Sequence, residues 1–222
     1  MTQRDTGESI RDTSRGLRVN IGRPLELLIV ENYVPFLREA ENVFMPLVDE
    51  GDINLTVAET LAEAEESLSE RKYDGIISNA YFRTGFSGQT ETAIVNGLEQ
   101  ELGAHYRALG EFTSNILEGW VQRITHPPSG IYLANRATEL RTPIVLCTEN
   151  ANLPEFEPLY LWSRGQDSQI VNLADCFFAH RNKSWNVATS SLMAQLYNNL
   201  NSSNTYKHGW FAAPFLLDRR FR

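Results

Sequence analysis

Short apolar runs alternate with amphipathic segments along most of the chain. Five runs have the length and continuous hydrophobicity typical of strands that are buried on both faces. They are LELLIV at 25–30, INLTVA at 53–58, GIISN at 75–79, TPIVLCT at 142–148 and ADCFFA at 174–179. Because helical periodicity fills the intervals between them, the pattern predicts an α/β fold, a three-layer sandwich in which helices cover both faces of a parallel sheet.

The intervening segments carry apolar residues at helical spacing. The pattern predicts helices over 33–50, 60–72, 130–140, 153–165 and 184–200. The expected inward face of the first helix consists of Val34, Leu37, Ala40, Phe44, Leu47 and Val48. Pro35 suits its first turn, and Pro46 is expected to bend or shorten its end. Thr60 followed by Glu63 predicts a capping box at the start of the second helix.

A long insertion interrupts this rhythm after the third apolar run. Within residues 80–128, apolar positions recur every three, four or seven residues from about 92 to 124, which indicates an amphipathic helix. Glycines interrupt the pattern, so one bent helix and two helices broken near Gly103 or Gly110 both fit. With this insertion, the predicted domain spans residues 24–200.

The two ends of the chain differ from the domain. Residues 1–23 are polar and charged, which predicts a disordered or loosely held arm. Residues 201–222 form a C-terminal tail that begins polar and then becomes apolar in WFAAPFLL, residues 210–217. This apolar segment could dock on a neighbouring protein or on the domain itself.

Composition narrows the class of protein. A hydrophobic content of 42% allows a buried core, and the formal net charge of −8 argues against nucleic acid as a partner. Cys147 and Cys176 lie in apolar runs and are expected to be buried free thiols in a reducing compartment. No apolar run approaches the ~20 residues that span a membrane. We expect a cytoplasmic protein with no membrane partner, no metal and no cofactor.

The order of motifs resembles the response-regulator receiver domain over about residues 25–79 and 129–200. YDGIIS before Asn79 resembles the third strand, which carries the phosphoacceptor aspartate of that family, and PIVLCT resembles the fourth strand, which ends in a hydroxyl residue, here Thr148. ADCFFAHRNK resembles the fifth strand. The resemblance implies a five-stranded parallel sheet of flavodoxin type, order 2-1-3-4-5, with a site at the carboxyl ends of the strands.

The chemistry of the receiver family needs parts that this sequence mostly lacks. Asn79 replaces the nucleophilic carboxylate with an amide, and Glu31 with Asn32 supplies one carboxylate where three would hold a divalent cation. Strand counting places His180 near the position of the family's lysine, while Lys183 follows three residues later without the family's proline. The resemblance implies a degenerate phosphoacceptor pocket without catalytic residues, formed by Glu31, Asn32, Asn79, Thr148 and Lys183.

These residues favour a pseudo-receiver, a phosphorylation-independent signalling or adaptor module that binds protein and is not an enzyme. Its partner is another protein or a second copy of the chain, as a homodimer through residues 92–124. The alternative is small-ligand or ion binding, or an enzyme, in a polar crevice at the carboxyl end of the sheet. That alternative lacks a glycine-rich phosphate loop, a nucleophile elbow and a metal-ligand pair.

Overall fold

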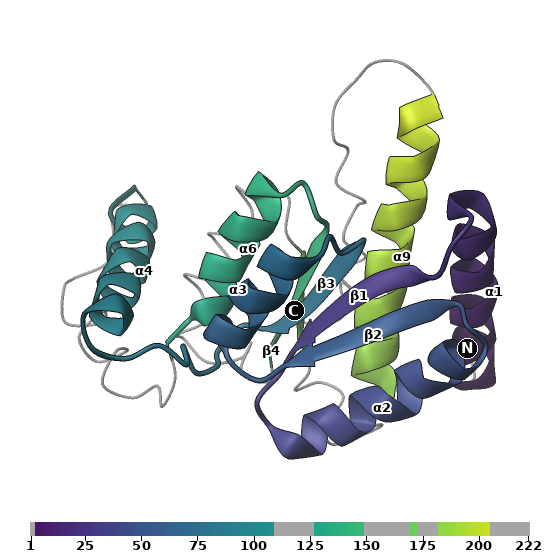
Figure 1. Cartoon of the computed structure of the whole chain (residues 1–222), viewed down its shortest axis with the longest axis horizontal. Coiled ribbons are helices and arrows are strands. Elements are labelled where there is room, and N and C mark those ends of the chain that lie inside the picture. The colour runs from purple at the N-terminus through teal and green to yellow at the C-terminus, as the bar shows by residue number, and fades with distance from the viewer. Residues whose placement is uncertain (1–2, 109–126, 149–168, 173–181, 205–222) are drawn as a thin grey trace, which may run out of the picture.

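A parallel sheet forms the centre of the molecule in the computed structural model, which describes residues 3–108, 127–148, 169–172 and 182–204. Its strands are β1 (Leu25–Val30), β2 (Ile53–Ala58), β3 (Gly75–Asn79), β4 (Ile144–Thr148) and β5 (Gln169–Asn172). They pair in the order β2-β1-β3-β4-β5 (Figure 1). The predicted α/β class with a parallel sheet is confirmed, and its first four strands lie in the predicted apolar runs.

The strand beside β4 differs from the sequence prediction. The prediction placed it at 174–179 because that run is the most apolar of the region, but those residues lie outside the described part of the chain. The strand observed next to β4 is β5, in register from Val145 opposite Gln169 to Thr148 opposite Asn172. A short strand is held by backbone hydrogen bonds to its neighbour, so local hydrophobicity did not locate it.

Helices cover both faces of the sheet. They are α1 (Gln3–Ile21), α2 (Val34–Asp49), α3 (Leu61–Glu70), α4 (Gly88–Ala108), α6 (Ser129–Glu139) and α9 (Asn182–Asn204). Figure 1 shows α2 and α9 on one side of the sheet and α3 and α6 on the other, with α1 beside α9. The predicted helix 153–165 lies outside the described residues. No helix in the described ranges is long and apolar enough to cross a membrane.

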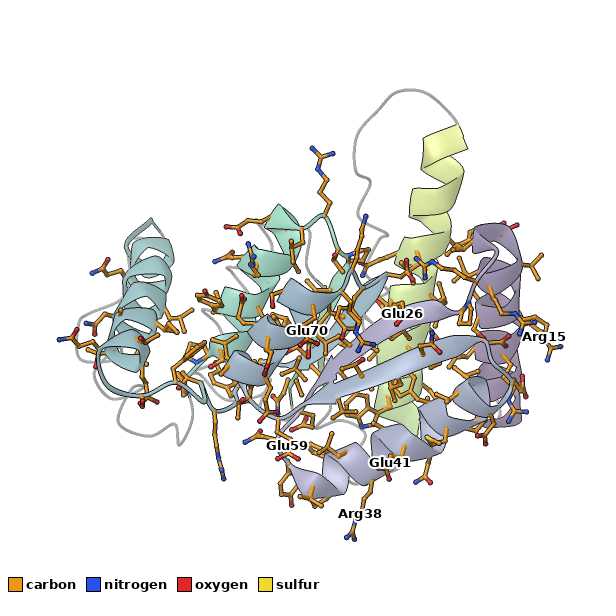
Figure 2. The ribbon with its side chains drawn as sticks, viewed as in Figure 1. Arg15, Glu26, Arg38, Glu41, Glu59 and Glu70 are labelled. Atoms are coloured by element: carbon orange, nitrogen blue, oxygen red, sulfur yellow. The ribbon has the colours of Figure 1, made fainter. Side chains whose placement is uncertain are left out.

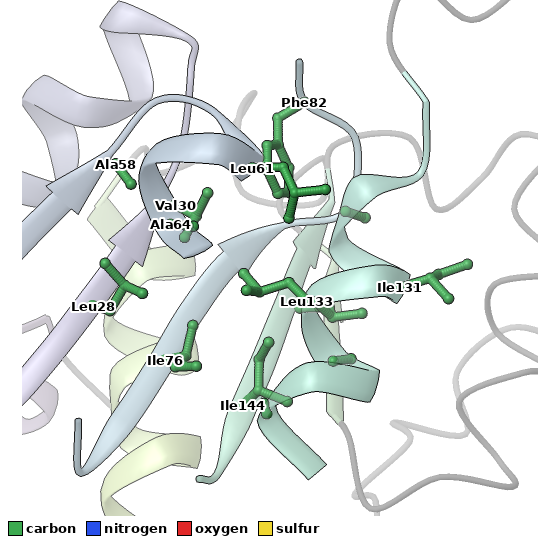
Figure 3. Close-up of a cluster of buried hydrophobic side chains, with 14 of the residues drawn as sticks. Leu28, Val30, Ala58, Leu61, Ala64, Ile76, Phe82, Ile131, Leu133 and Ile144 are labelled. Carbon is green, nitrogen blue, oxygen red and sulfur yellow. The ribbon is translucent and has the colours of Figure 1, made fainter. Parts of the chain in front are cut away.

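Two hydrophobic cores lie against the two faces of the sheet, because successive residues of a strand point to opposite sides. Leu28 and Val30 of β1 belong to the core under α3 and α6, which Figure 3 shows in close-up. Leu27 and Ile29 belong to the core under α2 and α9, together with Phe44. All these side chains are almost fully buried, so β1 is covered on both faces.

Helix α2 is rotated slightly from the face that its sequence predicted. Phe36 is buried, whereas Val34 is 54% exposed and Leu37 only partly buried. The helix also continues through Pro46 to Asp49, so the expected shortening does not occur. Leu47, one residue later, is buried in the core and holds the last turn in place. Figure 2 shows that the outer face of α2 carries charged side chains such as Arg38 and Glu41.

The capping box predicted for α3 is present in altered form. Thr60 is the N-cap and accepts a hydrogen bond from the backbone N–H of Glu63 at 3.2 Å. The Glu63 carboxylate accepts from the N–H of Glu59, one residue before the cap, at 2.7 Å. Both interactions satisfy backbone donors at the start of α3 that have no partner within the helix.

The disordered arm predicted for residues 1–23 is wrong over Gln3–Ile21, which form helix α1. Ile10, Ser14 and Leu17 are buried at helical spacing. Ile10 and Leu17 belong to the α2 and α9 core, and the Ser14 hydroxyl donates to Oδ2 of Asp52 at 3.5 Å. Arg18 forms an ion pair with Asp52, which is fully buried, at 3.0 Å. The apolar stripe of α1 is narrow, and the attachment of the helix also depends on the Asp52 carboxylate, 34 residues after Arg18 in the sequence. Local composition therefore did not predict it.

The insertion contributes helix α4, which begins four residues before the predicted start at about residue 92. Leu98 is buried in the core under α6, and Ile94 packs against the same core. The predicted break near Gly103 is wrong, because α4 continues through this residue to Ala108. Residues 109–126 lie outside the described part of the chain, so a break near Gly110 remains a prediction. At the other end of the domain, α9 runs to Asn204 and takes up the first residues assigned to the tail.

Candidate functional site

The candidate site lies where β1 and β3 end. These strands are neighbours, with Val30 opposite Ser78. Glu31 follows β1 immediately and Asn79 is the last residue of β3. Because parallel strands bring their carboxyl ends to the same edge of the sheet, the two polar side chains meet there.

The Asn79 side chain forms a two-pronged contact with Glu31. The amide Nδ2 donates to Oε1 of Glu31 at 3.0 Å and to Oε2 at 3.1 Å. The other side of the amide is also engaged, because Oδ1 accepts from the backbone N–H of Tyr81 at 3.1 Å. Both polar ends of the Asn79 side chain therefore have partners within the chain.

Glu31 is a buried carboxylate, with 0% of its surface exposed. Burying a carboxylate is costly unless it accepts hydrogen bonds. Besides Asn79, the backbone N–H of Tyr33 donates to Oε1 at 2.8 Å. A hydrogen bond to a charged group contributes about 1.5–3 kcal/mol. The amide of Asn79 thus offsets part of the free-energy cost of burying the Glu31 carboxylate.

Gly130, at the start of α6, closes the site from the α6 side. Its N–H donates to the carbonyl of Ala80 at 3.1 Å. A Cβ at this position would lie 2.6 Å from the carbonyl oxygen of Asn79 and 2.8 Å from the Cα of Ala80. Only glycine permits this approach. The sequence signal for it is weak, a glycine where the predicted helix begins.

Cys147 of β4 lies opposite Asn79 in the sheet and is fully buried as a free thiol, as predicted. Burial raises the pKa of the Cys147 thiol strongly, and the charge of Glu31 raises it further. The thiol therefore stays protonated and is no nucleophile at neutral pH. Cys176 lies outside the described residues.

The remaining residues of the predicted pocket are placed only in part. Asn32 follows Glu31 and is partly exposed. Thr148 ends β4 at the same edge of the sheet, and Lys183 lies in the first turn of α9, but the side chains of both are outside the description. His180 also lies outside the described residues. Glu31 and Asn79 are thus the pair that the structure brings together.

The site contains one carboxylate, Glu31, and one amide, Asn79, which are hydrogen-bonded to each other. A magnesium ion prefers carboxylate oxygens in near-octahedral geometry and keeps several waters. Among the residues that the structure describes, no group of three His, Cys, Asp or Glu side chains could hold a metal ion. An amide nitrogen has its lone pair delocalised into the carbonyl group, so Asn79 cannot replace a carboxylate as nucleophile.

Comparison with solved structures finds similar backbones at low sequence identity. The signal receiver domain of an HD domain-containing protein from Pseudomonas fluorescens Pf-5 is 15% identical with a TM-score of 0.44, over 82% of this chain and 93% of that one. The receiver domain of the Francisella response regulator 1452 is 13% identical with a TM-score of 0.40, over 81% and 99%.

A third structure is the chemotaxis response regulator CheY4 of Vibrio cholerae, which is 12% identical with a TM-score of 0.37, over 80% of this chain and 98% of that one. No protein-family model matches the sequence, and no curated protein matches it. Two of these three solved structures are receiver domains, and the third is a chemotaxis response regulator.

Proposed function

We propose that the chain is a receiver-like signalling or adaptor module that works without phosphorylation and acts by binding protein. The observation that carries the proposal is the contact between the Asn79 amide and both oxygens of Glu31 at the carboxyl edge of the sheet. In this proposal Asn79 occupies the position of a phosphoacceptor, which makes the domain a pseudo-receiver within two-component signalling.

The chemistry of the pair supports this reading. Phosphoryl transfer to a receiver needs a carboxylate nucleophile and a cation that neutralises the phosphoryl oxygens. Here the candidate acceptor is a neutral amide, and the neighbouring carboxylate is already engaged by that amide and by the N–H of Tyr33. The amide stabilises the buried charge that a cation would otherwise neutralise.

The insertion supports binding of protein as the output. Helix α4 stands away from the sheet and packs on α6 (Figure 1). A groove of about 660 Å³ between them is lined by apolar and aromatic side chains such as Ile94 and Tyr132, together with the polar residues Gln89, Thr90 and Asn135. Such a groove suits an amphipathic helix of a partner. The partner is another cytoplasmic protein or a second copy through residues 92–124, and sedimentation velocity distinguishes the two by the mass of the complex.

Incubation with magnesium and acetyl phosphate, followed by intact-mass spectrometry, tests the proposal. We expect the native chain to keep its mass, because the amide of Asn79 cannot attack phosphorus. The matched variant is Asn79→Asp, which restores a carboxylate in nearly the same shape. We expect this variant to gain the mass of one phosphoryl group.

The outcomes separate two parts of the proposal. A phosphoryl group on the native chain, located in the peptide that contains Asn79, would contradict phosphorylation independence. If neither protein gains mass, the native result stands but the relation of the pocket to a receiver site loses its support. Stoichiometric binding of a cation or small anion by the native chain at this edge would favour the alternative, a ligand site.

A further inference from the structure

A groove of about 520 Å³ lies between α1 and α9, away from the candidate site. Ile10 and Met193, which are 3% and 1% exposed, form its base. Gly16, Ala194 and Tyr197 also line it, and half of the Tyr197 surface is exposed. The rest of the lining is polar and consists of Asp12, Thr13 and Ser190. The groove is thus a mainly apolar surface formed by two helices that a further segment of chain could cover.

Gly16, one of the residues that line this groove, is a glycine inside helix α1. Glycine inside a helix costs about 1 kcal/mol relative to alanine. A Cβ at Gly16 would meet nothing within 4 Å, so packing in the described part of the chain does not require glycine here. A residue without a side chain does allow another backbone to approach closely. The position is therefore suited to a bound peptide segment.

We propose that residues 210–217 of this same chain, WFAAPFLL, bind in the groove between α1 and α9. These residues lie outside the described part of the structure, and all eight are apolar or proline. Proline lacks a backbone N–H and disfavours a helix interior, so we expect the segment around Pro214 to bind in an extended form. An extended segment places alternate side chains towards the groove.

The length of the chain allows this arrangement. Helix α9 ends at Asn204, and its groove residues are numbered between Ser190 and Tyr197. At 1.5 Å per residue these positions lie about 10–21 Å back along the helix axis. The five residues 205–209 can span about 17 Å when extended. The apolar segment therefore begins within reach of the groove if the chain turns back after α9.

Charge around the groove is mixed. Residues 205–222 contain four Lys and Arg and one Asp, a formal charge of +3, and Asp12 in the groove can pair with one of these basic residues. The helices that form the groove are not acidic as a whole, because α1 has four Arg against three Asp and Glu and α9 has one Lys and no acidic residue. Apolar contact, and not net charge, therefore provides the main attraction for the segment.

Limited proteolysis of the full chain tests the proposal. A lysine-specific protease can cut after Lys207, beside the proposed bound segment, and docking protects that bond because cleavage follows the population of the undocked form. Ala194→Arg places a long charged side chain in the groove, at an exposed position of α9. We expect cleavage after Lys207 to become at least about tenfold faster, the change that a tenfold weaker docking equilibrium gives.

Two further variants make the test specific. Val19→Arg introduces the same side chain on α1 at a position that is 69% exposed and does not line the groove, and cleavage should stay unchanged. Replacement of Phe211, Phe215 and Leu216 by Ser should accelerate cleavage as Ala194→Arg does. Amide NMR signals of Gly16 and Tyr197 should shift in that variant, whereas signals of α3 should not.

Two results would overturn the inference. If cleavage after Lys207 is equally fast in the native chain and in the groove variant, the tail is not docked there. If protection appears only as the protein concentration rises, the occupant is the tail of a second copy. Concentration-independent protection that Ala194→Arg removes is the result we expect. Neither result depends on whether Asn79 accepts phosphate, so the two proposals can fail separately.

Discussion

The Asn79 side chain combines two structural tasks at the end of β3. Its Nδ2 donates to the buried Glu31 carboxylate, and its Oδ1 accepts from the N–H of Tyr81, which fixes the turn that follows the strand. The sequence placed both residues at one edge of the sheet, because each follows a strand. It could not reveal that the amide and the carboxylate bond to each other, since 48 residues separate them.

At the same scale, the close packing at Gly130 can be tested by the addition of a single methyl group. In Gly130→Ala the added Cβ would lie 2.6 Å from the carbonyl oxygen of Asn79, which is backbone and cannot rotate away. We expect a loss of about 1–3 kcal/mol of stability, the usual cost of overpacking, measured by chemical denaturation. The matched control is Gly97→Ala in α4, where a Cβ meets nothing within 4 Å. An unchanged denaturation midpoint for Gly130→Ala would contradict this packing.

At the scale of elements, the apolar runs predicted β1, β3 and β4 because the interior strands of a covered sheet are apolar on both faces. They also located β2, although it is an edge strand and its Val57 is 48% exposed. The sequence predictions failed where contacts between residues far apart in the sequence determine the structure. Helix α1 depends on Arg18 and the buried Asp52, and the phase of α2 depends on how Phe36 meets the core. β5 depends on its pairing with β4. The local spacing of apolar residues predicts none of these contacts.

The attachment of α1 gives a prediction at this scale. Arg18→Ala leaves the Asp52 carboxylate buried without its ion-pair partner. We expect a loss of about 1–3 kcal/mol, the cost of an unsatisfied buried group, together with faster hydrogen exchange in α1. Arg15→Ala is the control, because its pair with Glu50 is exposed and contributes at most about 1 kcal/mol. Figure 2 shows Arg15 on the outer surface. Equal effects of the two variants would contradict this role of Asp52.

At the scale of the whole molecule, a parallel sheet with two covered faces supports three separate features. The carboxyl edge carries the Asn79 and Glu31 pair, the insertion adds a groove between α4 and α6, and α1 adds a second groove beside α9. The sequence indicated the first feature through the resemblance to receivers. It predicted the insertion but not its groove, and it missed the second groove because α1 was not expected to fold.

The central claim is that the Asn79 amide remains hydrogen-bonded to Glu31 and takes no part in phosphoryl transfer. The most direct measurement follows the side-chain NH₂ signals of Asn79 by NMR in the native chain while magnesium and beryllofluoride are added. We predict that both signals stay unchanged and that the hydrogen directed at Glu31 exchanges slowly with water, because the two carboxylate oxygens share it as acceptors. A specific, saturable shift of these signals would show a working anion and cation site and would contradict the proposed function.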